Sequence, residues 1–388
     1  MFDQNEDVPP STLDHAEALC KHAVALDSED GEVRAVYARL LTAYISMGYD
    51  RSPARRAAAR SQAELAAKLA PTSDYVQVVL ANIYRHEEAT EAEAERILRA
   101  VIARQPNHKL AWRTLGHLLR LSGRHEEATS AYQKAADLPG GDPLALFNLA
   151  ISLRNLGRWD ESGAALDRAI ALHPHGVFLV QKALLAARRG DLLAARTIVE
   201  KVPGSAQTEP LNVFHAVTVW LWSREPGKAL SVWQSVPQDY VETANYTGPK
   251  DYLTGTALWM DDRRDAALNA WRAALQVVEQ RLAMQSNSRD LVGWKGVLLW
   301  RLGDASGARQ ALRLFLQMPV NNTRANTLGP RTVAASLGLG DRGELIDEVK
   351  RQLQSAPMSG YVRFDPDLDS VRGEPWFQAL LAEADAKK

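Results

Sequence analysis

The chain has 388 residues, of which 46% are hydrophobic, with 46 Lys and Arg against 47 Asp and Glu. This hydrophobic content suffices for a folded core and excludes a disordered chain. The balanced charge argues against general nucleic-acid binding, which needs a basic surface. The single cysteine, Cys20, excludes an internal disulfide and a cysteine-based zinc site, and its helical spacing indicates a buried structural thiol.

Two features bear on the compartment. Residues 1–10 are acidic and polar, unlike a signal peptide. The most apolar stretch, 213–222, is interrupted by His215 and is shorter than the ~18–20 residues of a membrane span. We therefore expect a soluble, cytoplasmic protein, or a periplasmic one if the chain is part of a longer, membrane-tethered signalling protein.

The chain opens with a helical pattern that lacks a partner. Ala16, Cys20, Ala23 and Leu26 have the spacing of the second helix of a helical pair, so we expect the natural protein to begin further upstream. Weak helical pairs follow over residues 32–71, with an insertion near 49–56, and over 75–106.

Residues 109–138 carry the clearest repeat. A large residue, a Leu-Gly step, a turn glycine and a small-aromatic-small pattern follow one another: Trp112, Leu115, Gly116, Leu119, Gly123, Ala128, Tyr132 and Ala135. Small residues let two helices approach closely and large ones fill the space between them. The pattern recurs in the next pair, whose turn glycine Gly157 lies 34 residues after Gly123. This is the tetratricopeptide-repeat signature and period.

Further pairs extend over about 183–203, 220–237, 255–285 and 296–315, and a degenerate pair over about 327–353, so we count roughly nine pairs in residues 1–357. No alternating runs predict strands. In residues 358–388 we expect an extended segment and then a helix from Pro375, with Trp376, Phe377, Leu380 and Leu381 on one face, which caps the array. The predicted fold is an all-α tetratricopeptide-repeat solenoid, a right-handed superhelix of antiparallel helix pairs with a C-terminal capping helix.

Four phrases resemble a narrower group, the C-terminal tetratricopeptide regions of bacterial signalling proteins with an adenylate cyclase, Ser/Thr kinase or winged-helix domain. They lie at residues 25–30, 68–71, 277–287 and, most specifically, 364–381 (FDPDLDSVRGEPWFQALL). The resemblance implies a sensor or scaffold, as a fragment of a longer protein or as a stand-alone relative.

Motifs that carry chemistry are scarce. The G-x-G-x-x-G at 338–343 falls in the turn between two predicted repeat helices, whereas a dinucleotide site needs it after a strand. The histidines do not cluster, and no hydrolase, metalloprotease or phosphate-loop motif occurs. We therefore predict a protein that is not an enzyme and has no cofactor or metal.

The first helix of each pair lines the concave groove in tetratricopeptide proteins, and two groups of residues fall at groove positions here. The first group is cationic and polar: Arg113, His117, Arg120, Asn148, Arg154, Lys182 and Arg188. It favours an acidic or carboxylate-bearing partner, since guanidinium groups pair bidentately with carboxylates. The alternative is that these are solvated surface charges. The five-residue carboxylate clamp of some eukaryotic members is incomplete, because only Asn148 matches it.

The second group is aromatic: Trp222, Tyr252, Trp259 and Trp300. Such side chains could hold the apolar anchors of a peptide, or they could pack against a neighbouring helix. We thus predict a module that binds a protein or peptide, acidic or with apolar anchors. The alternative function is a structural scaffold for dimerisation or assembly, and the oligomeric state, monomer or dimer, stays open.

Overall fold

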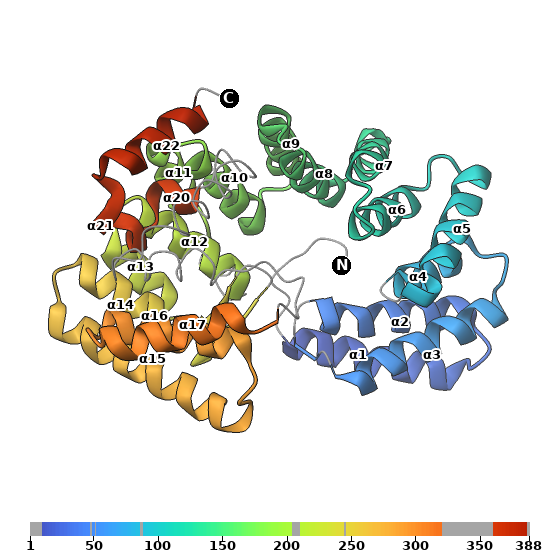
Figure 1. Cartoon of the computed structure of the whole chain (residues 1–388). Helices are drawn as coiled ribbons and strands as arrows, with labels where there is room; N and C mark the ends of the chain where they lie inside the picture. The colour runs from blue at the N-terminus through green and yellow to red at the C-terminus, as the bar shows by residue number, and fades with distance from the viewer. Residues whose placement is uncertain are drawn as a thin grey trace. The chain divides into compact units, whose positions relative to one another are not determined.

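A computed structural model describes residues 10–46, 49–50, 52–85, 88–203, 210–243, 246–319 and 360–385 (Figure 1). Contacts divide the chain into two compact units, Met1–Phe178 and Leu179–Lys388, called here the N-terminal and the C-terminal unit. Each unit is described on its own.

The N-terminal unit is built from consecutive helical pairs. Its helices are α1 (Pro10–Leu26), α2 (Gly31–Ser46), α3 (Pro53–Leu69), α4 (Asp74–Tyr84), α5 (Glu88–Arg104), α6 (Lys109–Leu121), α7 (His125–Asp137), α8 (Pro143–Asn155) and α9 (Trp159–Leu172). Helices α2 and α3, α4 and α5, α6 and α7, and α8 and α9 pack as pairs, and the first helices α2, α4, α6 and α8 also pack in sequence. Helix α1 packs on α2, in the place that the second helix of a pair would take.

The small and large positions of the repeat explain this packing. A Cβ atom on Gly116 of α6 would lie 2.7 Å from the ring of Tyr132 of α7, so only glycine lets these helices approach this closely. Tyr132, Ala128 and Ala135 are fully buried between the two helices. Gly123 ends the first helix with a φ of 74°, a left-handed conformation that glycine adopts without strain.

The C-terminal unit continues the pattern with α10 (Gly176–Arg188, whose first turn precedes the boundary), α11 (Leu192–Val199), α12 (Pro210–Trp222), α13 (Pro226–Trp233), α14 (Lys250–Met260), α15 (Arg264–Met284), α16 (Arg289–Arg301) and α17 (Ala305–Gln317). Helix α15 has 21 residues and ends at Met284, which agrees with the end of the predicted pair 255–285. The predicted pair at 327–353 and the glycine motif at 338–343 lie outside the described residues.

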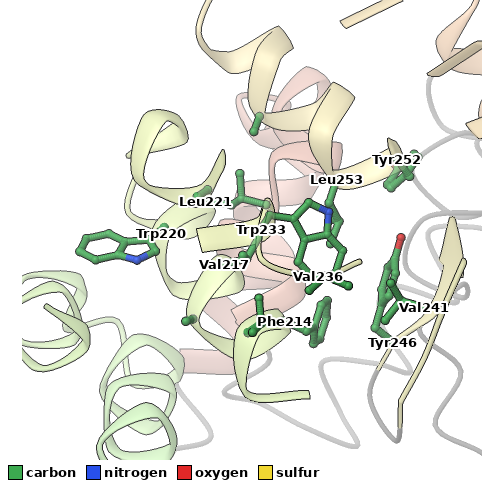
Figure 2. Packing of buried hydrophobic residues seen from close by; sticks show 14 of the residues in the cluster. Phe214, Val217, Trp220, Leu221, Trp233, Val236, Val241, Tyr246, Tyr252 and Leu253 are labelled. Atoms are coloured by element: carbon green, nitrogen blue, oxygen red, sulfur yellow. The ribbon is translucent and has the colours of Figure 1, made fainter. Parts of the chain in front are cut away.

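A β-hairpin interrupts the repeats between α13 and α14. Strands β1 (Tyr240–Glu242) and β2 (Thr247–Pro249) pair antiparallel, although strands were expected to be almost absent. Tyr246, just before β2, is fully buried, and its ring stacks on Phe214 with 5.0 Å between centroids. The hairpin thus delivers an aromatic side chain into the core of the unit (Figure 2).

Residues 360–385 form short helical turns in place of the extended stretch expected before Pro375. They are α20 (Gly360–Phe364), the 3-10 turn η2 (Pro366–Leu368), α21 (Asp369–Arg372) and α22, which spans Pro375–Asp385 and begins at the predicted proline. Figure 1 shows α20 and α21, in red, beside the helices of the C-terminal unit.

Cys20 is half-buried and packs against a small cluster of Leu13, Leu40, Ala43 and Tyr44. Burial, and next the nearby carboxylate of Glu17, raise the pKa of the thiol, which keeps it protonated. In the part of the chain that the structure describes, no helix is both long and apolar enough to cross a membrane.

Candidate functional site

The first helices of the N-terminal unit line an open cavity of about 260 Å³, called here the arginine cavity. Its walls come from α2, α4, α6 and α8 and the turn after α4. The lining residues are Arg39, Thr42, Ala43, Ser46, Val78, Val79, Asn82, Arg85, Leu110, Arg113, Thr114, His117, Leu144, Phe147 and Asn148. Because successive first helices supply these residues, the cavity follows the face that tetratricopeptide arrays use as a groove.

Charge is the distinctive property of this cavity. Among the described residues that line it there are Arg39, Arg85, Arg113 and His117, but no Asp or Glu. Side chains of one sign around a partly desolvated space attract a ligand of the opposite sign. The lining therefore fits an anionic group.

Arg113 lies on the cavity wall, and its guanidinium pairs with a carboxylate from the following repeat. It is buried, and its Nη1 lies 2.9 Å from Oδ2 of Asp142. Asp142 also caps α8, because its Oδ1 accepts hydrogen bonds from the backbone N–H groups of Leu144 and Ala145 at 3.0 Å each. Arg113 is thus committed to a structural ion pair and is not a solvated charge on an open wall.

Arg85 lines the cavity without the carboxylate partner that Arg113 has. It is half-buried, and its Nε donates hydrogen bonds to Oδ1 and the carbonyl oxygen of Asn82, at 2.8 and 3.1 Å. No carboxylate in the described part of the chain forms an ion pair with it. Burial lowers the pKa of Arg85 to about 10; Tyr132 opposes this with a smaller effect, and the nearby charge of Arg120 adds to it. Burial thus destabilises the charged form of this guanidinium, and an anion bound beside it would stabilise that form.

Two further predicted residues, Arg120 and His117, lie on α6 together with Arg113. Arg120 is half-buried, and its Nε is buried without a hydrogen-bond partner among the described residues. His117 lines the cavity, and its Nδ1 lies 3.1 Å from the hydroxyl of Tyr132. Burial raises the pKa of Tyr132, while Arg120, Arg85 and Arg113 lower it, so this phenol lies in a cationic environment.

The remaining wall is amide and apolar. Asn148 lines the cavity and donates a hydrogen bond from Nδ2 to the carbonyl oxygen of Leu144 at 2.7 Å. Val79, Leu110 and Phe147 add apolar surface beside it. The cavity can therefore contact both a carboxylate and the aliphatic part of a peptide.

The other cationic predictions fall outside this cavity. Arg154 is half-buried in the last turn of α8. Lys182 and Arg188 are half-buried on α10 in the C-terminal unit. Arg39, Asn82 and Arg85 were missed, although Arg85 precedes Arg120 by 35 residues and so repeats its position at the end of a first helix. Alignment of the weak pair 75–106 on the clear one would have found it.

Two of the four predicted aromatic residues are core residues. Trp222 is 2% exposed and Tyr252 is fully buried. The hydroxyl of Tyr252 donates a hydrogen bond to Oδ2 of Asp367 at 2.8 Å, and the Trp222 ring packs on Phe364, with centroids 6.2 Å apart. Residues 360–385 therefore cover both side chains, so an open aromatic wall is not present at these positions.

The other two aromatic residues reach the surface. Trp259 is 39% exposed, and the guanidinium of Arg264 lies 3.9 Å from its ring centroid. Trp300 is half-buried and contacts both the main core and the cluster formed by the C-terminal helices, while the Arg301 guanidinium lies 4.4 Å from its ring centroid. These contacts match the packing alternative more closely than a ladder of free rings.

The described residues contain no group of three or more His, Cys, Asp or Glu side chains that could hold a metal ion. Within the same residues, the site is a cationic cavity on stacked first helices.

These features define an all-α tetratricopeptide-repeat solenoid, and the chain is a tetratricopeptide-repeat protein. The family model described as tetratricopeptide repeat matches residues 92–143, 147–210 and 252–319.

Curated relatives match short parts of the chain. The human protein O-mannosyl-transferase TMTC3 is 29% identical over 149 residues, which are 38% of this chain and 16% of that protein. The peroxisomal targeting signal receptor of Kluyveromyces lactis is 40% identical over 75 residues, 19% of this chain and 13% of the receptor. The matched parts thus span less than a fifth of either relative.

Among solved structures, the human IFIT1 dimer with m7Gppp-AAAA superimposes with a TM-score of 0.50 at 16% identity, over 81% of this chain and 69% of that one. This likeness concerns the fold alone.

Proposed function

We propose that this protein is a non-catalytic binding module whose arginine cavity receives an acidic segment of a partner protein. Tetratricopeptide-repeat proteins act as protein-binding scaffolds. The observation that carries the proposal is Arg85, a partly desolvated guanidinium that faces a cavity without acidic lining residues in the described part of the chain. A carboxylate of the partner would supply the anion that Arg85 lacks.

The lining suggests how such a segment would bind. A carboxylate near Arg85 can accept bidentate hydrogen bonds from the guanidinium, and the amides of Asn82 and Asn148 are placed to contact the adjoining peptide backbone. Phe147 and Val79 would cover an aliphatic or aromatic neighbour of the acidic residue. The ligand class is therefore an extended peptide with Asp or Glu next to an apolar residue.

The test measures binding of fluorescent peptides that alternate acidic and apolar residues, against matched peptides with Lys in place of Asp. We expect the acidic series to bind and Arg85→Met to weaken it at least about tenfold, since a hydrogen bond to a charged group contributes about 1.5–3 kcal/mol. Arg96→Met is the matched control, because Arg96 is an exposed arginine of α5 paired with Glu93.

Two outcomes would contradict the proposal. One is equal affinity of Arg85→Met and the unchanged protein for the acidic peptides. The other is preference for an oligonucleotide with a 5′-triphosphate over every acidic peptide, which would make the anion a phosphate. The second probe is included because the IFIT1 structure, which shares the fold, holds a capped oligonucleotide.

The cellular setting that we propose is the sensor or scaffold part of a bacterial signalling system, supported by the resemblance of residues 364–381. Binding of the partner would then be reported to an effector. The alternative, an assembly scaffold, predicts a dimer in light scattering without any added peptide, whereas a binding module needs no self-association.

A further inference from the structure

The C-terminal residues lie on the side of the C-terminal unit where first helices meet. Gly360 packs on Trp222 of α12, and Asp367 contacts Tyr252 of α14 and Arg301 of α16. Helices α12, α14 and α16 are the first helices of three successive pairs. We call the side chains of these helices that contact residues 360–385 the tail-covered face.

Asp367 is a buried charged residue of the tail. Its side chain is 3% exposed and forms an ion pair with Arg301, whose own side chain is 12% exposed. The Tyr252 hydroxyl donates a further hydrogen bond to it at 2.8 Å. One carboxylate thus receives a guanidinium and a phenol from two different repeats, which is how a groove recognises an acidic ligand residue.

An aromatic contact accompanies the carboxylate. The Phe364 ring lies against Trp222, and a Cβ atom on Gly360 would be only 2.2 Å from the Trp222 ring, so the tail backbone lies directly on this indole. Asp369 adds an exposed ion pair with Arg224 at 2.6 Å. Phe364, Asp367 and Asp369 therefore act as an apolar anchor followed by two acidic ones.

The fit between tail and helices is close. Asp365, Pro366 and Asp367 lie beside Leu221 of α12 and Leu253 of α14, and the gap between them is about 10 Å³. This is about the space that a single buried water needs, so the tail lies close against the two helices. Residues 360–367 thus contact the first helices of three successive pairs.

We propose that the tail-covered face is a second peptide-binding groove, which recognises an acidic segment with an aromatic anchor. The chain's own residues 360–369 are its resident ligand, and a partner segment of the same chemistry replaces them. This inference is independent of the arginine cavity, because every residue that carries it belongs to the C-terminal unit.

The experiment uses the full chain and a labelled peptide of residues 358–385 added in trans. Asp367→Asn weakens the resident tail by removing its buried charge, and Gly360→Ala weakens it by steric conflict with Trp222. A red shift of tryptophan emission reports that Trp222 has been uncovered, and circular dichroism reports that the helices remain folded.

We expect both variants to bind the peptide at least about tenfold more tightly than the unchanged chain, in which the tethered tail competes at an effective concentration of about 1 mM. Adding Arg301→Gln to either variant should weaken binding at least about tenfold, since it removes the guanidinium partner of Asp367. Arg313→Gln, an exposed arginine of α17, is the matched control and should leave binding unchanged.

Three results would overturn the proposal. The first is a tail that stays bound in both variants, seen as no red shift of tryptophan emission, since a replaceable ligand must dissociate when its contacts are removed. The second is release of the tail without binding of the added peptide, or binding of that peptide that Arg301→Gln does not weaken. The third is dimers formed by exchanged tails in light scattering, which would make the occupant a second copy of the chain.

Discussion

Arg85→Met should stabilise the protein while it weakens ligand binding. Burial lowers the pKa of Arg85 from 12.5 to about 10, which corresponds to a destabilisation of the folded state of about 3 kcal/mol. Partial exposure screens part of this, and the hydrogen bonds to Asn82 are lost, which costs about 1 kcal/mol. We therefore expect the free energy of unfolding to rise by about 1–2 kcal/mol at pH 7.

Urea denaturation followed by circular dichroism measures this difference, and its pH dependence has a definite sign. The pKa of Arg85 is lower in the folded state than its ordinary value, so the destabilisation is complete below about pH 10 and is relieved as the pH rises above it. The gap between variant and unchanged protein should thus be constant from neutral to mildly alkaline pH and shrink above pH 10.

The control is Arg96→Met, an exposed substitution in the same unit that should change the free energy of unfolding by less than about 0.5 kcal/mol. A less stable Arg85→Met variant would refute the reasoning, because Arg85 would then be a structural residue. A site that binds an oppositely charged ligand is expected to lower the stability of the folded protein while the ligand is absent.

Three other changes test the rest of the fold. Arg113→Met should lower the free energy of unfolding by about 3–5 kcal/mol in urea titrations, because it leaves the buried carboxylate partner uncompensated; an unchanged midpoint would show that the pair is dispensable. Gly116→Ala should cost about 1–3 kcal/mol by the same measurement, since its Cβ would lie 2.7 Å from the Tyr132 ring; a neutral result would mean that the ring moves freely. Hydrogen bonds from the side chain and backbone of Ser52 lower the pKa of Asp50 to about 2, so its stabilising contribution is present above pH 4 and lost as the pH falls towards 2; an NMR titration with a midpoint near 4 would contradict this.

The helical pairs follow from the sequence because their code is local and periodic. Gly116, Ala128 and Tyr132 fit one another across a single turn, and the turn glycine Gly123 returns 34 residues later as Gly157. The long helix α15 was predictable for the same reason. The hairpin was not, because strands of three residues carry no periodic signal, and the burial of Tyr246 depends on rings from α12, α13 and α16.

In the candidate sites, too, some features follow from the sequence and others depend on the tertiary structure. The sequence by itself determined which side chains stand on first helices, and therefore that Arg113, Arg120 and His117 lie in one region. Only the tertiary structure decided that Arg113 pairs with Asp142, whereas Arg85 lines the cavity without a carboxylate partner among the described residues. An ion pair between neighbouring repeats depends on rotamers and helix spacing, and periodicity does not encode these.

Tyr252 and Asp367 are the clearest example of a contact that only the tertiary structure decided. They lie 115 positions apart, yet their side chains share a buried hydrogen bond. A repeat pattern determines the face on which a residue lies, but a segment outside the repeats can cover that face. For this protein, the sequence alone established a tetratricopeptide solenoid with a distinct tail, and long-range packing, which no local signal records, decided that the tail lies along the first helices.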